Sequence, residues 1–114
     1  MHELGIVFHV IKSVERVAED NKLEKVSAVV LELGEVSGVV PDYLTDCWKW
    51  ASAKTELVEG SELRIETLPA VTHCDGCGRD YPTVVHGRTC PRCGSGNTWL
   101  LTGNEMNIKE IEAY

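Results

Sequence analysis

The sequence has few basic residues and no long hydrophobic run. Lys and Arg together number 11 against 18 Asp and Glu, which gives a net charge of -7 at pH 7. Nucleic acids and anionic membranes bind clustered Lys and Arg, so this balance argues against both as partners. No apolar run approaches the about 20 residues that a transmembrane helix needs, and we expect no membrane association.

The start of the chain lacks the layout of a secretory signal. Acidic Glu3 stands where a signal peptide carries basic residues before an apolar stretch. We therefore expect a cytoplasmic protein, whose five cysteines serve as metal ligands or reactive thiols before disulfides. No Ser-His-Asp arrangement, glycine-rich phosphate loop or open metal site stands out, which predicts that the protein is not an enzyme.

Apolar residues at helical spacing predict two helices. The first covers about residues 4–20, where one stripe repeats at intervals of three and four. Its members are Leu4, Val7, Val10, Ile11, Val14, Val17 and Ala18. Pro41 suits the first turn of a second helix, because its missing N–H costs no hydrogen bond there. Cys47 shares the apolar face of that helix, and we expect it to be a buried small hydrophobic residue.

Three short segments predict a small sheet. Residues 25–33 are rich in β-branched side chains and predict a strand buried on both faces, and residues 62–68 alternate as a strand does. Residues 105–112 are expected to be extended, although a short helix is the alternative. The predicted fold class is α+β: a small mixed sheet covered by two helices, with an inserted four-cysteine zinc-ribbon module. The domains would be 1–69 plus 103–114, and 70–102.

The inserted module carries two Cys-x-x-Cys pairs. The first is Cys74 and Cys77, the second is Cys90 and Cys93, and a glycine follows each pair. Glycine permits a tight knuckle in which backbone N–H groups point at the sulfurs. Two facing knuckles supply four thiolates, the geometry of closed structural zinc sites. Iron in a rubredoxin-like site is the alternative metal.

Two histidines lie beside the cysteine pairs in the sequence. His73 precedes Cys74 directly, and His86 lies four residues before Cys90. Both are either surface loop residues or groups that donate to the sulfurs and tune the site with pH. A site of four sulfurs leaves no open coordination position, so its metal would stabilise the module rather than catalyse.

The N-terminal Met1-His2-Glu3 can chelate a metal. The α-amine of Met1 has a pKa near about 8, so a metal can displace its proton at neutral pH. The His2 imidazole and backbone nitrogen form fused five- and six-membered rings with that amine. The Glu3 amide or a loop group would fill a fourth position. Such a planar, nitrogen-rich set suits Ni(II) or Cu(II), whereas the simple alternative is a frayed chain end.

Taken together, these motifs resemble a known family. "MHEL" at the start, "LGEVSGV" after the first strand, the two cysteine pairs and "GNEMNI" after them are similar to the HypA/HybF hydrogenase nickel-insertion proteins. The resemblance covers essentially the whole chain. It implies a cytoplasmic metallochaperone with Ni(II) as transient cargo and structural Zn(II). Its client would be the large subunit of [NiFe] hydrogenase, with the nickel-handling GTPase HypB as partner.

The resemblance also implies roles for single residues. The family's nickel ligand falls on His2, with Met1 and Glu3 beside it, and its zinc ligands fall on the four cysteines of the two pairs. Asp42 and Glu105 are further candidates near the nickel. Three questions stay open: whether the protein is a monomer or a weak homodimer, whether urease is a second client, and which metal the cysteine site holds. The alternative function is a zinc-ribbon adaptor or nucleic-acid module with an incidental His2.

Overall fold

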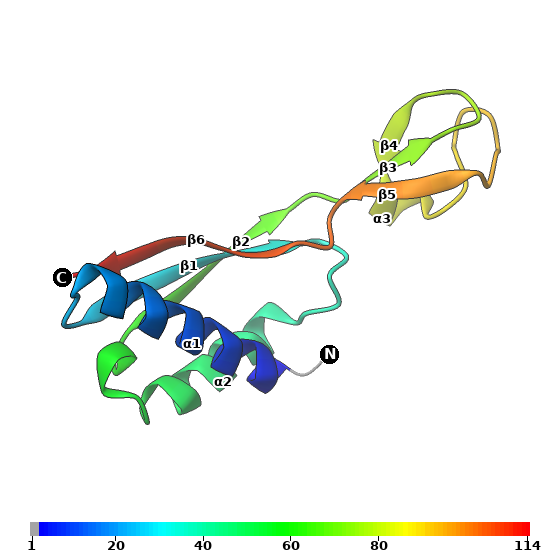
Figure 1. The fold of residues 1–114 in the computed structure, drawn as a ribbon. Helices are drawn as coiled ribbons and strands as arrows, with labels where there is room; N and C mark the ends of the chain where they lie inside the picture. Colours follow the sequence, from blue (N-terminus) through cyan, green and yellow to red (C-terminus); the bar gives the residue numbers. More distant parts are fainter. Residues whose placement is uncertain (1–2) are drawn as a thin grey trace. The chain divides into compact units, whose positions relative to one another are not determined.

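The computed structural model describes residues 3–114, which form two compact units. Among these residues, unit 1 comprises the chain up to Glu32 together with Val39–Glu66 and Asn107–Tyr114. Unit 2 comprises Leu33–Gly38 and Thr67–Met106. Both units are therefore built from segments that are distant in the sequence (Figure 1).

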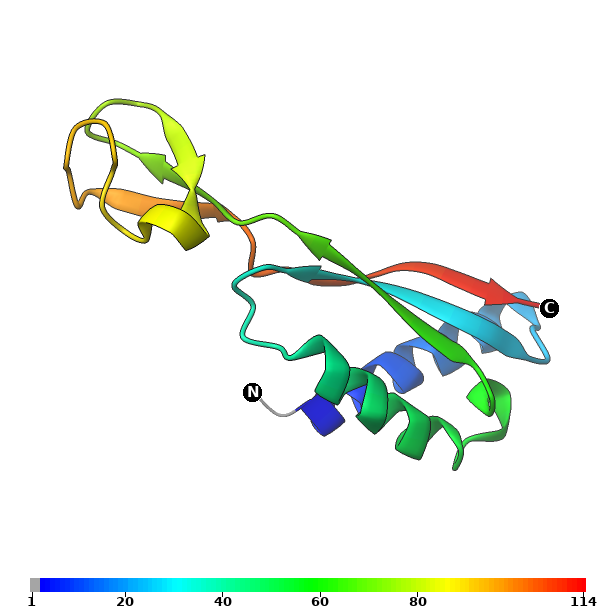
Figure 2. The same ribbon diagram turned by 180° about the vertical axis from the view of Figure 1, so that it is seen from behind.

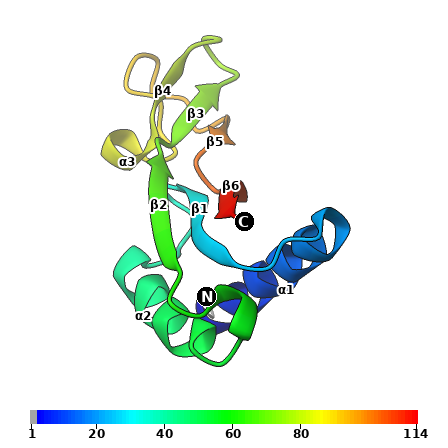
Figure 3. The same ribbon diagram turned by 90° about the vertical axis from the view of Figure 1, so that its left-hand side faces the viewer.

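Two helices pack against each other in unit 1. They are α1 (Glu3–Asn21) and α2 (Pro41–Ser52), and Figure 3 shows both on the same side of the first sheet. Pro41 opens α2, as predicted. The α1 stripe is buried at Val7, Val10, Ile11, Val14 and Ala18. Leu4 and Val17 were expected in this stripe but are exposed, because both lie at its flanks, where the neighbouring layer no longer covers the helix.

The first sheet has three strands in the order β2-β1-β6. These are β1 (Val26–Gly34), β2 (Glu62–Leu68) and β6 (Met106–Ala113). The arrowheads of β1 and β2 point the same way in Figure 2 and that of β6 points the opposite way, so the sheet is mixed. Lys25 and Tyr114 exchange two backbone hydrogen bonds of 2.9 and 3.0 Å, as an antiparallel pair does.

The core of unit 1 lies between the helices and this sheet. Most β1 residues are buried, with Val26 and Val29 fully so, and this confirms a strand covered on both faces. Trp48 of α2 is 1 % exposed, and its indole N–H donates to the Ser61 hydroxyl at 3.1 Å. Ser61 follows the short 3-10 helix η1 (Glu56–Val58) in the chain. The predicted α+β fold with two helices on a small mixed sheet is confirmed.

Unit 2 contains a second sheet that the sequence did not predict. It has the order β4-β3-β5, with β3 (Val71–Cys74), β4 (Asp80–Pro82) and β5 (Thr98–Thr102) all antiparallel. The short helix α3 (Thr83–His86) follows β4. Residues 98–102 are extended along their whole length. The small buried cluster of this unit consists of Cys74, Tyr81 and Cys90.

Within residues 3–114, none of the helices combines the length and the hydrophobicity that a membrane span requires.

Candidate metal centre

Two knuckles of the same construction carry the four cysteines. In the first, the Gly78 N–H donates to the Cys74 carbonyl at 2.8 Å, and in the second the Gly94 N–H donates to the Cys90 carbonyl at 2.9 Å. Both glycines adopt a positive φ, 73° and 72°, which residues with a Cβ rarely tolerate. The glycine after each cysteine pair is therefore the residue that lets the chain reverse so tightly.

The knuckles bring four sulfur atoms to one point. The Sγ atoms of Cys74, Cys77, Cys90 and Cys93 all lie within 4.8 Å of one another. Cys74 Sγ is 3.6 Å from Cys93 Sγ, and Cys77 Sγ is 3.7 Å from Cys90 Sγ. A disulfide joins its sulfurs at about 2.05 Å, so these are separate thiols. The predicted clustering of the four cysteines is confirmed, and their arrangement could hold a metal ion.

The sulfur spacing suits a tetrahedral metal ion. Four sulfurs at about 2.3 Å from a central zinc lie about 3.8 Å apart along the edges of a regular tetrahedron. The two measured separations, 3.6 and 3.7 Å, are close to this value. One cysteine of each knuckle is buried and the other exposed, so the group lies at the edge of the small core of unit 2.

The thiols of the second knuckle ionise at different pH. The backbone N–H of Cys93, and then that of Arg92, favour the Cys90 thiolate against burial and lower the pKa of Cys90 to about 6. At Cys93 the Ser95 backbone N–H favours the thiolate. The Cys74 thiol, burial and the other two thiols outweigh it and raise the pKa of Cys93 to about 11. A cation among the sulfurs would favour the thiolate at every ligand.

His73 lies between two carboxylates beside this centre. Its Nδ1 is 2.6 Å from an Asp80 carboxylate oxygen, its Nε2 is 3.6 Å from Asp75, and its ring packs at 5.4 Å from that of Trp99. The contacts with Asp80 and Trp99 follow from the register, because these two residues are the cross-strand partners of His73 in β4 and β5. The sequence reasoning missed both Asp75 and Asp80. The knuckle could have revealed Asp80, because it pairs His73, which precedes the first cysteine, with the residue two positions after Gly78.

His86 ends α3 and packs edge-on against Tyr81, with ring centroids 5.9 Å apart. The Tyr81 hydroxyl donates to the Gly87 carbonyl at 2.9 Å. Among residues 3–114, the structure gives neither His73 nor His86 a hydrogen bond to a sulfur atom.

Of the N-terminal candidates, Met1 and His2 lie outside the described residues. Glu3 begins α1 and is 8 % exposed. One of its carboxylate oxygens, Oε2, accepts a hydrogen bond of 3.1 Å from the Val40 backbone N–H. The Glu3 carboxylate thus links the first turn of α1 to the residue that precedes α2.

The other two acidic candidates lie in different units. Asp42 is exposed in the first turn of α2, in unit 1. Glu105 belongs to unit 2, where its carboxylate accepts a hydrogen bond of 2.7 Å from the Gly103 N–H. A similar bond of 2.9 Å joins the Glu35 carboxylate to the Ala70 N–H. These two carboxylates hold the loops at one end of unit 2.

Cys47 is not buried in the core as predicted. It is half-buried and lines a surface hollow of about 250 Å³ with Leu4, Tyr43, Asp46 and Trp50. Like Leu4, it lies at the flank of its helix's apolar stripe. Phe8 packs edge-on against Trp50 across this region, with centroids 6.3 Å apart.

Comparison with known proteins identifies the family. The model of the family described as "Hydrogenase/urease nickel incorporation, metallochaperone, hypA" matches residues 1–113. The chain belongs to the HypA family. It is 38 % identical over 111 residues to the hydrogenase maturation factor HypA of Chlorobium phaeobacteroides, and the match covers 97 % of each chain. It is 37 % identical over 112 residues to that of Geobacter metallireducens, with 98 % of each covered.

The fold agrees with this membership. The solution structure of the Ni metallochaperone HypA from Helicobacter pylori superposes with a TM-score of 0.75 at 24 % identity, covering 99 % of this chain and 97 % of that one. The predicted resemblance to the HypA/HybF proteins is confirmed. The chain is thus a member of a nickel metallochaperone family of hydrogenase maturation.

Proposed function

We propose that this chain binds Ni(II) at Met1-His2-Glu3 and delivers it to the large subunit of [NiFe] hydrogenase. Membership in a nickel-incorporation family supports nickel as the cargo. The chemistry of the N-terminus supports this terminus as the nickel site. The α-amine, the His2 amide nitrogen and the His2 imidazole form two fused chelate rings, and such planar nitrogen sets suit Ni(II).

The observation that carries the proposal is the anchoring of Glu3. The carboxylate of this 8 % exposed residue bonds to the Val40 N–H, so the residue that follows His2 is fixed to the body of unit 1. A chelate formed by the two residues that precede a fixed helix needs less ordering than one on a free tail. Because it is made at a chain end, it can also exchange its ligands one at a time with an acceptor.

A nickel titration of the untagged protein tests this site. Replacing His2 by Ala, or extending the N-terminus by Gly-Ser, should abolish the planar Ni(II) absorption band and weaken binding at least about tenfold, since each change removes a chelate ring. His9→Ala is the matched control, because His9 is an exposed histidine of α1. Unchanged affinity with the planar band retained in both altered proteins would disprove the N-terminal site.

Zinc is the resident metal that we propose for the four cysteines. It would neutralise part of the thiolate charge and join the two knuckles, and its closed sulfur set would keep it out of the transfer chemistry. Metal analysis of protein expressed in medium containing both zinc and iron should give one zinc per chain. One iron per chain, with the absorption of iron–thiolate bonds, would overturn this assignment.

The two domains would then have different functions. Residues 1–69 with 103–114 would form the nickel-binding domain, and residues 70–102 a zinc-binding ribbon domain that docks on partners. This chain would be a monomer or weak homodimer. It would act in the cytoplasm together with the nickel GTPase HypB.

Delivery is tested by mixing the Ni(II)-loaded protein with nickel-free hydrogenase large subunit and a chelator that captures released nickel. Transfer at a rate above that of free Ni(II), lost in the His2→Ala protein, is expected. Equal rates with and without this chain would argue against delivery.

A further inference from the structure

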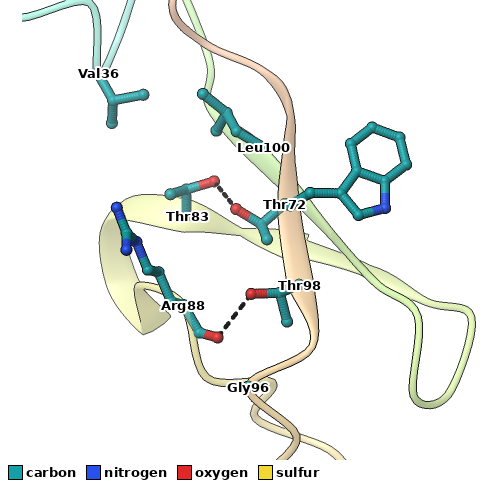
Figure 4. A pocket seen from close by; sticks show the side chains of 8 residues that line it. Val36, Thr72, Thr83, Arg88, Gly96, Thr98 and Leu100 are labelled. Carbon is teal, nitrogen blue, oxygen red and sulfur yellow. Dashed lines mark hydrogen bonds between the residues drawn. The ribbon is translucent and has the colours of Figure 1, made fainter.

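Unit 2 contains a cavity of about 470 Å³ that the metal centre does not use. It borders α3 and β5 (Figure 4), and its volume falls within the range of about 300–1,000 Å³ typical of small-ligand sites. It is lined by Val36, Thr72, Thr83, Arg88, Gly96, Thr98, Trp99 and Leu100.

Hydrogen bonds hold the walls of this cavity in place. The Val36 N–H donates to the Gly103 carbonyl at 2.8 Å, and the Thr83 N–H donates to the Ala70 carbonyl at 3.1 Å. Inside, the Thr72 and Thr83 hydroxyls lie 2.6 Å apart, and the Thr98 hydroxyl donates to the Arg88 carbonyl at 2.7 Å (Figure 4). The cavity is therefore preformed and needs little ordering when a ligand enters.

The donors in this cavity suit an anion. Arg88 contributes five guanidinium N–H donors, and among residues 3–114 it takes part in none of the ion pairs, unlike Arg64, which pairs with Glu62 and Glu112. The bond between the Thr72 and Thr83 hydroxyls uses only one of their two protons, so the second can be donated to a ligand. A fork of N–H groups with a nearby hydroxyl is a common arrangement around carboxylates.

The remaining walls are apolar or backbone. Val36 and Leu100 contribute aliphatic side chains, and Gly96 leaves space. Trp99 alternates with Thr98 and Leu100 along β5, so its indole lies on the other face of the strand, where it contacts His73. A ligand that fills the cavity would therefore carry one anionic group on a small apolar body.

We propose that this cavity binds a carboxylate carried by a peptide, either at a chain end or on an acidic side chain. A single arginine in a chain of net charge -7 favours a singly charged anion over a phosphate dianion. Within the described residues β5 is also an edge strand of the sheet β4-β3-β5. An extended peptide entering the cavity would lie beside a strand edge with which it can pair.

Nuclear magnetic resonance of the zinc-loaded protein tests the proposal with three probes. Acetyl-Ala-Ala-Val with a free carboxylate presents a chain end, acetyl-Ala-Glu-Ala amide presents only a side-chain carboxylate, and acetyl-Ala-Ala-Val amide has neither. At least one of the first two should shift the amides of Thr98 and Leu100 and the Nε–H signal of Arg88. Comparing the two carboxylate peptides shows whether the cavity accepts a chain-end or a side-chain carboxylate.

Two arginine variants supply the matched comparison. Arg88→Gln should weaken binding about tenfold or more, because it removes the charge-assisted hydrogen bonds. Arg79→Gln removes the same charge from an exposed position of the same unit outside the cavity and should leave binding unchanged. Retained zinc and an otherwise unchanged amide spectrum show that each variant is folded. Equal binding of the amide probe, equal weakening by both variants, or no shift up to about 10 mM peptide would overturn the proposal.

Discussion

The Glu3 carboxylate accepts a hydrogen bond of 3.1 Å from the Val40 backbone N–H, across 37 positions of sequence. It joins the start of α1 to the residue before α2, at the end of unit 1 where the proposed nickel chelate begins. Glu3 also stands in the first turn of α1, where a negative charge interacts favourably with the helix dipole. One carboxylate therefore positions the terminus and stabilises the helix pair.

Replacing Glu3 tests this link. Glu3→Ala should lower the free energy of unfolding by about 1–2 kcal/mol, because the Val40 N–H loses a charged acceptor in a half-buried place. Glu3→Gln keeps an acceptor oxygen and should cost about half as much. Chemical denaturation of unit 1, followed by circular dichroism, measures both. Glu15→Ala, at an exposed position of the same helix, is the control and should stay within about 0.5 kcal/mol of the parent.

Two glycines that touch each other in unit 2 should not tolerate a side chain. A Cβ on Gly34 would lie 1.9 Å from the Gly103 carbonyl oxygen, and a Cβ on Gly103 would lie 2.5 Å from the Cβ of Ala70. Gly103 also has a φ of +124°, which strains any other residue. Gly34→Ala and Gly103→Ala should each cost about 2 kcal/mol or more in thermal unfolding.

Gly96→Ala is the matched control for these two variants. Its Cβ would meet nothing within 4 Å, and its φ is not in the positive region. It should therefore change stability by less than about 0.5 kcal/mol. A Gly34→Ala protein as stable as Gly96→Ala would show that the two chain segments do not approach as closely as described.

Much of the fold follows from local sequence patterns. Each of these patterns lies within the element that it predicts. They are the apolar stripe from Val7 to Ala18 in α1, the β-branched run of β1 and Pro41 at the start of α2. In α1, burial of one face imposes the helical period on the apolar residues. The spacing of the cysteines, each pair followed by glycine, likewise predicts their meeting point. In these cases one short segment carries the whole signal.

The features that were missed depend on contacts between distant segments. Strands β3 and β4 have only four and three residues, too short for a period to be recognised. Leu4, Val17 and Cys47 lie at the flanks of their stripes, so their exposure depends on how far the neighbouring layer extends. The cavity beside Arg88 combines residues from Val36 to Leu100, and no local pattern brings them together.

Removing the metal should unfold unit 2 and leave unit 1 largely intact. The buried cluster of unit 2 contains two of the proposed metal ligands, Cys74 and Cys90, with Tyr81 as its one large side chain. A structural zinc supplies on the order of 10 kcal/mol to such a module. After chelation, amide signals of residues 70–98 should collapse to unfolded positions while those of α1 and β1 persist. Loss of both sets of signals at the same chelator concentration would contradict independent stability of unit 1.

Zinc binding should release a pH-dependent number of protons. The Cys90 thiol, with a pKa of about 6, is already a thiolate at pH 7.5, whereas Cys93, with a pKa of about 11, must lose its proton when the metal binds. Fewer than four protons per zinc should therefore be released at pH 7.5, rising toward four at pH 5. Because protons compete with zinc for the sulfurs, affinity must fall as the pH falls, and more steeply below pH 6 than above it. Calorimetry in buffers of different ionisation enthalpy measures the proton count. Four protons released at both pH values would show that Cys90 is protonated until the metal arrives.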